Sequence, residues 1–474
     1  MAEYSPLSTS EDQPTPQLQN KREFKINYIT IFFFLAIGIT LWTSIPSLIY
    51  LFSGRLEKSI PIEPSQESSV PTHTSPILNF EPSEPHPEMT KRIISAYFTS
   101  WSIYAREFNV KDLDAKKISH INYAFANLDA DGSVKLGDPW ADTDKHFDGD
   151  SWNEGGNNLY GNWKQLGLLK KNNRHLKVLI SIGGWTWSTN FPAVAADLSK
   201  RKRMIASAIK MMYDLGADGI DIDWEYPSTE SDADNYVELC KEFRHELDKY
   251  AEKIGEKIPF LLTAAVPCEP NVYKKRLKDM SKYLDFFNLM SYDMAGSWSS
   301  VTGHQANLYG DDLSVDKAVT SYISRGVPAQ KIVVGIPMYG RSFIKTKGIG
   351  HPFDGIGEGT WEKGVFDYKK LPPQNAQEFF DDKVVASYSY DSITKELVSY
   401  DTPDVVRLKT KYVIDKNLRG VMNWEISADF FASHSRSLLA IEFDSLDGTN
   451  CLDSTPNHIY YPDSVYDNVR SYFD

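Results

Sequence analysis

The decapeptide DGIDIDWEYP, residues 218–227, places four acidic residues inside an otherwise apolar stretch. Alternate side chains of a strand point to opposite faces, so Asp221, Asp223 and Glu225 would share one face at intervals of about 6.6 Å. Like charges at that spacing repel each other, and burial would strengthen the repulsion. Such a row persists where some of the carboxyl groups keep their protons, which means that their pKa values are shifted. The stretch therefore predicts a strand whose acidic side chains have shifted pKa values.

Two ordinary explanations compete with this interpretation. An acidic strand that faces solvent is the usual outcome of alternating charge. A calcium-binding loop also has oxygen ligands at alternate positions, but the sixth residue counted from Asp221 is Tyr226, where that loop needs glycine. The twelfth is Asp232, where it needs glutamate. The calcium loop is excluded, and the rest of the chain argues against the solvent-facing strand.

The composition of the 474-residue chain fits one large α/β domain with appendages, or two to three ordinary domains. Hydrophobic residues make up 41% of the chain and aromatic residues 13%, which is ample for a large core. A net charge of −13 argues against nucleic acid as a partner, because phosphate binding needs basic patches. The three cysteines are widely spaced, and the sequence lacks CxxC, HExxH and Cys/His clusters. We therefore expect no disulfide framework, no metal site and no cofactor.

The N-terminal part of the sequence predicts a membrane anchor. No charged residue lies between Lys25 and Arg55, and the apolar run 26–52 is long enough to cross a bilayer. A secretory signal peptide is the competing interpretation, but its apolar region is normally shorter and is followed by a small-residue cleavage site. Basic residues before the run favour a cytoplasmic tail over residues 1–25. We expect a single-pass type II membrane protein whose remaining chain lies outside the cell or in a lumen.

A stalk and a series of strands follow the predicted span. Residues 53–90 carry seven prolines among many serines and glutamates, a composition that predicts an extended stalk. From Lys91 on, short apolar runs rich in β-branched and aromatic residues recur. These eight runs are 93–98, 120–127, 176–184, 218–225, 259–267, 285–293, 331–337 and 420–425.

The intervals between these runs complete the predicted fold. Several carry helical periodicity, as in the apolar stripe that ends at Gly255. Eight strands that alternate with helices predict an α/β fold, a (β/α)8 TIM barrel over residues 91–441, with its site at the carboxyl ends of the strands. Residues 342–405, between strands 7 and 8, contain further strand-like pieces and predict a small α+β insertion lobe. Residues 442–474 would form a C-terminal extension packed on the barrel.

Several motifs, in order along the chain, resemble those of the glycoside hydrolase family 18 chitinases. DGIDIDWEYP fits that family's DxxDxDxE motif. The supporting motifs are SIGGW (181–185), MSYDM (290–294), GIPMYGR (335–341), GTWEKGVFDY (359–368) and VMNWE (421–425). The stretch ADTDKHFDGDSWNEGGNNLYGNWKQLGLLKK is similar to fungal-type chitinases in particular. The resemblance covers about residues 91–441 and does not extend to the predicted span or stalk.

The resemblance implies hydrolysis of the β-1,4 bonds between N-acetylglucosamine units, with retention of configuration. Glu225 would protonate the glycosidic oxygen. The acetamido carbonyl of the substrate would attack the sugar in place of a second carboxylate, a recognised exception to the two-carboxylate scheme. Asp223 would hold the acetamido N–H and stabilise the cationic intermediate, while Asp221 would share a proton with Asp223. Tyr292 would hydrogen-bond the acetamido oxygen.

The resemblance also implies which residues bind the sugars. Trp424 would form the floor under the distorted sugar, with aromatic faces from other strand ends for the neighbouring units. The remaining expected binding residues are Tyr97, Trp101, Phe125, Gly184, Trp185, Met290, Asp293, Tyr339, Arg341 and Met422. The aromatic residues could instead be ordinary core residues, and Arg341 could simply pair with a structural acid. Trp187 and Trp298 stay unassigned.

Three functions are compatible with the sequence. The favoured one is a membrane-anchored, endo-acting chitinase, monomeric, with chitin and chito-oligosaccharides as its partners; the sequence leaves the preference for endo or exo action open. A chitin-binding lectin on the same fold usually lacks the terminal acid, which is present here as Glu225. An endo-β-N-acetylglucosaminidase acting on N-glycan cores normally has a more open site with a sparser aromatic lining.

Overall fold

The computed structural model describes residues 91–269, 271–310 and 312–473. The predicted cytoplasmic tail, membrane span and stalk fall on residues 1–90 and lie outside the described residues. Within the described ranges, no helix combines the length and the apolar character that crossing a bilayer would require. The described residues belong to one compact unit, Pro85–Asp474, and that unit contains every predicted site residue.

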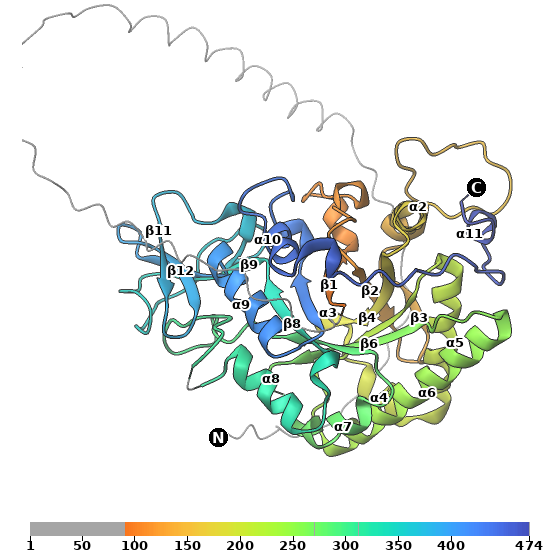
Figure 1. Ribbon diagram of the computed structural model, residues 1–474, viewed down its shortest axis with the longest axis horizontal. Coiled ribbons are helices and arrows are strands. Elements are labelled where there is room, and N and C mark those ends of the chain that lie inside the picture. Colours follow the sequence, from red (N-terminus) through yellow and green to blue (C-terminus); the bar gives the residue numbers. More distant parts are fainter. Residues whose placement is uncertain (1–90, 270, 311, 474) are drawn as a thin grey trace, which may run out of the picture. The chain divides into compact units, whose positions relative to one another are not determined.

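Eight parallel strands close into a barrel (Figure 1). Neighbouring barrel strands follow chain order, and the first strand closes the ring by pairing with both the second and the last. Each of the eight predicted runs coincides with one barrel strand. These are β1 (Ile93–Thr99), β2 (His120–Leu128), β4 (Lys177–Gly183), β5 (Gly219–Asp223), β6 (Leu261–Pro267), β7 (Phe286–Met290), β8 (Ile332–Pro337) and β14 (Gly420–Trp424). The predicted (β/α)8 TIM barrel is confirmed.

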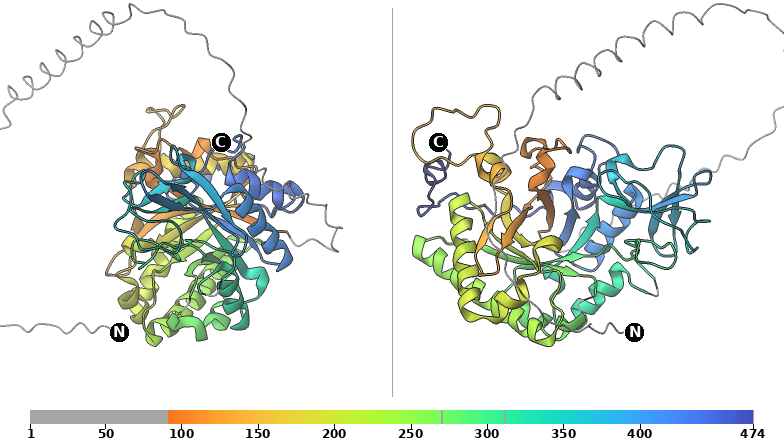
Figure 2. Two further views of the ribbon diagram at one scale, coloured as in Figure 1. Left: turned by 90° about the vertical axis from the view of Figure 1, so that its left-hand side faces the viewer. Right: turned by 180° about the vertical axis from the view of Figure 1, so that it is seen from behind.

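Helices run between the barrel strands and cover the outside of the barrel (Figures 1 and 2). In α6 (Glu230–Ile254), Thr229 and Asp232 cap the first turn reciprocally: each side chain accepts a hydrogen bond from the backbone N–H of the other residue. The helix ends at Gly255, whose φ of 73° is the left-handed conformation that glycine favours, as the sequence predicts. The other α-helices of the described residues are α2 (Gly161–Asn172), α3 (Gly184–Trp187), α4 (Phe191–Ala196), α5 (Leu198–Leu215), α7 (Leu277–Met280), α8 (Val315–Ser324), α9 (Pro403–Asp415), α10 (Leu438–Ser445) and α11 (Asp467–Arg470).

Short helical turns mark several connections of the barrel. They are η1 (Ser100–Ile103), η2 (Val110–Asp112), the π-helical η3 (Trp140–Asp144), η4 (Asn271–Lys275), η5 (Ala329–Lys331), η6 (Tyr368–Lys370), η7 (Ile426–Ala428) and η8 (Gly448–Asn450). A short antiparallel strand, β3 (Val134–Leu136), pairs with the end of β2.

The alternation along β5 orients the residues of the opening decapeptide as expected. Ile220 and Ile222 are fully buried in the main apolar core. Trp224 joins the same core, where its ring stacks on that of Phe191 at a centroid distance of 5.4 Å. The side chain of Asp221 points to the other side and bonds with residues of other barrel strands. The strand itself ends at Asp223, so Glu225 lies beyond the last ladder pair.

The chain leaves the barrel between β8 and β14 to build the predicted lobe, whose strands project from one side of the barrel (Figures 1 and 2). Its five antiparallel strands lie in the order β10-β9-β13-β12-β11. They are β9 (Tyr339–Phe343), β10 (Val365–Asp367), β11 (Gln377–Asp381), β12 (Ala386–Asp391) and β13 (Glu396–Ser399). The insertion between strands 7 and 8 is confirmed, and its sheet begins at Tyr339 because only Met338 separates β8 from β9.

The C-terminal residues pack against the barrel and provide partners for Asp218, the first acid of the decapeptide. Asp218 is fully buried and accepts hydrogen bonds from the backbone N–H of His458 at 2.8 Å and of Val178 at 2.7 Å. Its Oδ2 also lies 2.8 Å from the Nζ of Lys170. Asp218 therefore fastens the C-terminal segment to the barrel, whereas the other three acids belong to the carboxyl end of the strand.

Candidate active site

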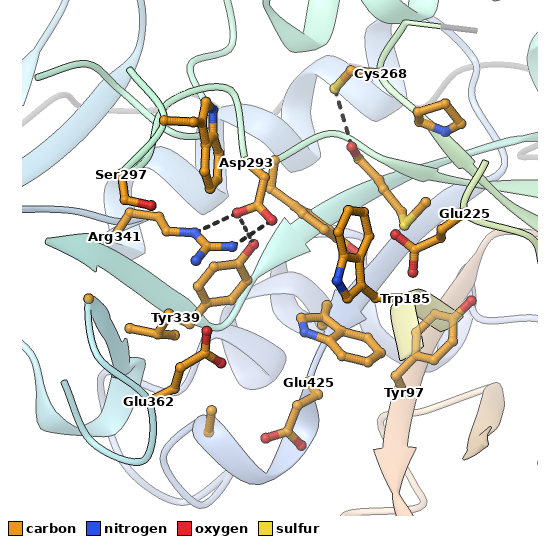
Figure 3. Close-up of a pocket in the computed structure, with 18 of the residues that line it drawn as sticks. Tyr97, Trp185, Glu225, Cys268, Asp293, Ser297, Tyr339, Arg341, Glu362 and Glu425 are labelled. Carbon is orange, nitrogen blue, oxygen red and sulfur yellow. Dashed lines mark hydrogen bonds and ion pairs between the residues drawn. The ribbon is translucent and has the colours of Figure 1, made fainter. Parts of the chain in front are cut away.

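The carboxyl ends of the barrel strands open into a cleft of about 890 Å³. Barrel residues such as Tyr97 and Glu225 line one part of it, and lobe residues such as Arg341 and Glu362 line another (Figure 3). The lobe thus forms a wall of the cleft. Within the described residues, no group of three or more histidine, cysteine or acidic side chains could hold a metal ion.

Asp221 lies fully buried beneath the cleft and accepts four hydrogen bonds. Its Oδ2 accepts from the Tyr97 hydroxyl at 2.8 Å and from Ser181 Oγ at 2.8 Å. Its Oδ1 accepts from Thr263 Oγ1 at 2.6 Å and from Asn288 Nδ2 at 3.1 Å. Burial raises the pKa of Asp221 above the ordinary value, while the four donors lower it by stabilising the charged form. The donors come from four different barrel strands, so the position of this carboxyl depends on the closed barrel.

Asp223 is almost as buried but lacks such donors. Its Oδ1 has no hydrogen-bond partner among the described residues. Burial, and then the charges of Glu225 and Asp221, raise its pKa well above the ordinary value. Asp223 therefore keeps its proton to a higher pH than an exposed aspartate does. The donors to Asp221 do not include Asp223, so the sharing of a proton between these two acids stays a prediction.

Glu225 faces the cleft just beyond the end of β5. Burial raises the pKa of its carboxyl above the ordinary value, and the charge of Asp293 acts in the same direction. Hydrogen bonds from the Tyr226 hydroxyl and the backbone N–H of Trp185 oppose this effect. A carboxylic acid with a raised pKa suits a group that must donate a proton near neutral pH. The sequence reasoning missed Tyr226 as a cleft residue, although it follows Glu225 directly in the same motif.

Three expected binding residues form one ionic cluster on the lobe side of the cleft. Arg341 and Tyr339 both point toward the carboxylate of Asp293 (Figure 3). The guanidinium of Arg341 also lies over the ring of Trp298, 5.1 Å from its centroid, in a cation–π arrangement. Arg341 therefore does pair with an acid, and that acid lines the cleft. Trp298, which had no expected role, lines the cleft as well.

Met290 and Tyr292 lie at the carboxyl end of β7. Both line the cleft. The Tyr292 hydroxyl lies 4.0 Å from Met422 Sδ, and its ring meets that of Tyr339 edge-on at a centroid distance of 6.0 Å. Burial, and then the neighbouring Tyr339, raise the pKa of Tyr292 well above the ordinary value. The hydroxyl therefore stays protonated and can donate a hydrogen bond into the cleft.

The expected aromatic residues divide into an exposed and a buried group. Trp101 and Trp185 are exposed by 40% and 77% and line the cleft. Trp424 also lines it. Tyr97 lines the cleft too but is only 1% exposed, and Phe125 is only 8% exposed, so both present little open ring surface. Their contact with sugars stays a prediction.

The buried aromatic residues support Trp424 from behind. The ring centroids of Tyr97 and Phe125 lie 5.3 Å and 5.8 Å from that of Trp424. Trp187, which also had no expected role, packs against the same cluster. Met422 is fully buried there too and does not line the cleft. The close packing that fixes this layer could not be predicted from strand periodicity alone.

Gly184 is also a packing residue rather than part of the cleft lining. Its φ is +73°, and a Cβ at this position would lie 2.7 Å from the ring of Phe125. A side chain at residue 184 would therefore displace Phe125 and, through it, the layer under Trp424.

A second cluster joins the barrel to the lobe along the cleft. Nη1 of Arg106 lies 2.9 Å from Oδ1 of Asp367 and 3.2 Å from Oε1 of Glu425. The indole Nε1 of Trp361 donates a 2.8 Å hydrogen bond to Asp367, and the guanidinium of Arg106 lies over its ring. Glu362 lines the same part of the cleft. The GTWEKGVFDY motif contained Trp361, Glu362 and Asp367, but its spacing gave no reason to assign them roles.

Known proteins resemble this chain over the same region. The model of the glycosyl hydrolases family 18 matches residues 93–429. Endochitinase 1 of Metarhizium robertsii is 50% identical over 384 residues, which cover 79% of this chain and 89% of that protein. Chitinase 1 of Aphanocladium album is 49% identical, covering 79% of this chain and 90% of that protein. Among solved structures, chitinase ChiA74 from Bacillus thuringiensis has a TM-score of 0.69 at 30% identity, covering 76% of this chain and 70% of that one.

Proposed function

This chain belongs to glycosyl hydrolases family 18, and from that membership we propose that it is an endo-acting chitinase. It hydrolyses the β-1,4 bonds between N-acetylglucosamine units of chitin and chito-oligosaccharides. The observation that carries the proposal is the sequence of acids Asp221, Asp223 and Glu225, which leads from the barrel interior into a cleft lined with aromatic residues. The similarity to two fungal chitinases over most of the chain supports the same substrate.

Glu225 is the general acid in this proposal. It faces the cleft, and burial holds its pKa above the ordinary value, so it keeps a proton to transfer up to a higher pH than an exposed glutamate does. Transfer of that proton to the glycosidic oxygen lets the bond between this oxygen and C1 break. The carboxylate formed then accepts a proton from the incoming water, and this restores the acid.

The substrate's acetamido group supplies the nucleophile. Its carbonyl oxygen bonds to C1 as the glycosidic bond breaks, and a cationic bicyclic oxazolinium results. Asp223 accepts a hydrogen bond from the acetamido N–H and stabilises this cation, for which it must be anionic. Burial and the charges of Glu225 and Asp221 raise the pKa of Asp223, and in this proposal Asp221 takes up or shares its proton. Water then attacks C1 from the face the leaving group vacated, so the β-configuration is retained.

The remaining predicted residues position the sugar. Tyr292, whose hydroxyl stays protonated, donates a hydrogen bond to the acetamido oxygen. Trp424 lies under the sugar at the cleavage site, and Tyr97 and Phe125 hold it in place. The exposed rings of Trp101 and Trp185 stack on sugars further along the chain. Met290, Tyr339 and Arg341 complete the wall, with Asp293 anchored between the last two.

The catalytic barrel is proposed to be tethered to a membrane on its non-cytoplasmic side. The support is the uninterrupted apolar run 26–52, the basic residues before it and the proline-rich segment 53–90 after it. Chitin lies outside the cell, which supports the same orientation independently of the charge bias. The remaining proposed boundaries are a tail over 1–25, a catalytic unit over 91–441 and a C-terminal extension over 442–474. The insertion predicted over 342–405 gains the first residues of β9, from Tyr339 on, as part of the lobe.

A product-length profile tests the proposed activity. The full chain, solubilised in mild detergent, is incubated with chitohexaose, and the early products are separated by size. Internal cleavage into trimers or into dimers plus tetramers is expected, with no activity in a Glu225→Gln control. Binding of the hexamer without cleavage would favour the lectin instead. Release of N-glycans from a glycoprotein, with chitohexaose left intact, would favour the endo-β-N-acetylglucosaminidase.

A further inference from the structure

Ser188 joins two neighbouring strand ends at the cleft through a single hydroxyl. It directly follows α3, the short helix that leaves β4, and it is only 5% exposed. Its Oγ accepts a 2.8 Å hydrogen bond from the backbone N–H of Glu225. The same Oγ lies 3.2 Å from the backbone oxygen of Asp223 and 3.0 Å from that of Gly184, and it donates its hydrogen to one of these.

Ser188 hydrogen-bonds the backbone of Glu225 at a point where the β4–β5 ladder has already ended. The ladder of β5 with β4 ends at the pair of Gly183 with Asp223, so the main chain at Glu225 has left the sheet. The intervening Trp224 is fixed by its stacking in the outer core. The backbone N–H of Glu225 has Ser188 Oγ as its acceptor, which fixes the start of the side chain that faces the cleft.

The turn that carries Ser188 also contacts the carboxyl of Glu225. The backbone N–H of Trp185, in α3, is near enough to that carboxyl to lower its pKa. The turn begins where β4 meets β5, because a Cβ on Gly183, the last residue of β4, would lie 2.3 Å from the backbone oxygen of Asp223. One turn therefore meets the acid at two points: it holds the backbone through the Ser188 hydrogen bond, and the N–H of Trp185 favours the charged form of the carboxyl.

We propose that Ser188 is a positioning residue for Glu225, and that its hydroxyl aims the carboxyl at the glycosidic oxygen. The inference rests on the proposed function. Ser188 does not line the cleft and touches no substrate, so it acts only through Glu225. Without the hydroxyl, the N–H of Glu225 loses its acceptor and the carboxyl is free to shift by a fraction of an ångström. Displacements of about 1 Å can lower catalytic rates about 10²-fold.

Two substrates whose leaving groups differ in their need for a proton distinguish a misplaced Glu225 carboxyl from a general loss of activity. Ser188→Ala is expected to lower kcat on chitohexaose about 10- to 100-fold while KM changes by less than about 3-fold. On 2,4-dinitrophenyl chitobioside, whose leaving group needs no proton, the same variant should lose less than about 3-fold. The basic limb of the pH profile should also move to lower pH, because a loosened carboxyl is better hydrated and loses part of the burial that raises its pKa.

Two further variants complete the experiment. Ser188→Thr keeps the hydroxyl and should restore most of the rate on chitohexaose. Ser464→Ala is the matched control, because Ser464 is equally buried and its Oγ also donates to a backbone oxygen, that of Asp214 at 2.8 Å, and accepts from a backbone N–H, that of Tyr466 at 3.2 Å. Ser464→Ala should lower the melting temperature without changing the pH profile or the response to the leaving group.

The outcomes separate this inference from the proposed function. Equal losses on both substrates, a wild-type pH profile or an unfolded Ser188→Ala protein would overturn the positioning role, since each would show a contribution to the fold only. The proposed function would survive that result as long as the wild-type protein cleaves chitohexaose and Glu225→Gln does not. A wild-type protein that cleaves neither substrate would overturn both.

Discussion

Arg341 donates two hydrogen bonds to Asp293, from Nε to Oδ1 at 2.8 Å and from Nη2 to Oδ2 at 2.7 Å. The Tyr339 hydroxyl adds a third, to Oδ1 at 2.6 Å. Asp293 follows the barrel strand β7, whereas Tyr339 and Arg341 lie on β9 of the lobe. The lobe is therefore fastened to the barrel near Glu225, and the charge of Asp293 held there raises the pKa of Glu225.

Asp293→Asn should move the basic limb of the pH profile to lower pH. The charge of Asp293 helps burial to raise the pKa of Glu225, so its removal lowers that pKa. Glu225 must be protonated to act, and activity is therefore lost at a lower pH than in the wild type. The measurement is kcat/KM for chitohexaose between pH 4 and 9.

Glu378→Gln is the matched control for this variant. Glu378 is a lobe carboxylate that accepts hydrogen bonds from both terminal nitrogens of Arg436, at 3.0 Å and 2.6 Å. It lies outside the cleft lining. The pH profile of Glu378→Gln should equal that of the wild type. A shift in both variants would mean that the overall charge, rather than the position of Asp293, determines the pH at which activity is lost.

Glu225→Gln should abolish turnover while binding survives. The amide keeps the size of the acid but has no proton to transfer, and general acid catalysis is typically worth about 10²- to 10⁴-fold. Binding of chitohexaose, followed by the fluorescence of the cleft tryptophans, should stay within a few-fold of the wild type. A near-normal rate would identify another residue as the acid.

Asp223→Ala should lower the rate strongly although Glu225 is intact, because the acetamido group then loses the partner that orients it and stabilises the cation. If that group is the nucleophile, the first product observed by NMR is the β-anomer. A neutral thiazoline mimic of the intermediate should inhibit, and oligomers with a free amine in the cleavage-site sugar should resist hydrolysis. Initial α-product, or normal cleavage next to the free amine, would refute the substrate-assisted mechanism.

Gly184→Ala should destabilise the protein more than Gly255→Ala does. Both glycines have a φ of +73°, so both substitutions carry the same left-handed backbone cost of about 1–2 kcal/mol. A Cβ at 255 meets nothing within 4 Å, whereas one at 184 would lie 2.7 Å from the ring of Phe125. Overpacking should add about 1–3 kcal/mol at 184. Urea unfolding measures both, and equal values would mean that Phe125 moves aside freely.

The full chain should behave as an integral membrane protein with its barrel outside the cytoplasm. The apolar run 26–52 is expected to hold it in the membrane fraction during carbonate extraction, and the barrel should resist protease in sealed, lumen-inward vesicles. Deleting residues 1–55 while adding a cleavable signal should release an active barrel. Release of the intact chain by carbonate, or a mature N-terminus near residue 55, would contradict the anchor.

Local patterns were sufficient to predict much of this protein. A side-chain period of two and short strand lengths identified all eight barrel strands, because both properties depend only on neighbouring residues. The same alternation placed Asp221 inside the barrel and Ile220 and Ile222 in its outer core. The motifs predicted Glu225, Asp293 and Trp424 at the carboxyl ends of their strands. Because these ends of parallel strands lie together at one end of the barrel, the three residues were expected at one site.

Contacts between distant segments were decided only by the tertiary structure. The bond of Ser188 to Glu225 crosses 37 residues, and that of Arg341 to Asp293 crosses 48. The burial of Tyr97 and Phe125 behind Trp424 is of the same kind. A sequence pattern gives the direction of a side chain on its own strand but not which side chain of another strand it meets. That is set by the register in which the barrel closes and by the packing that fills its interior.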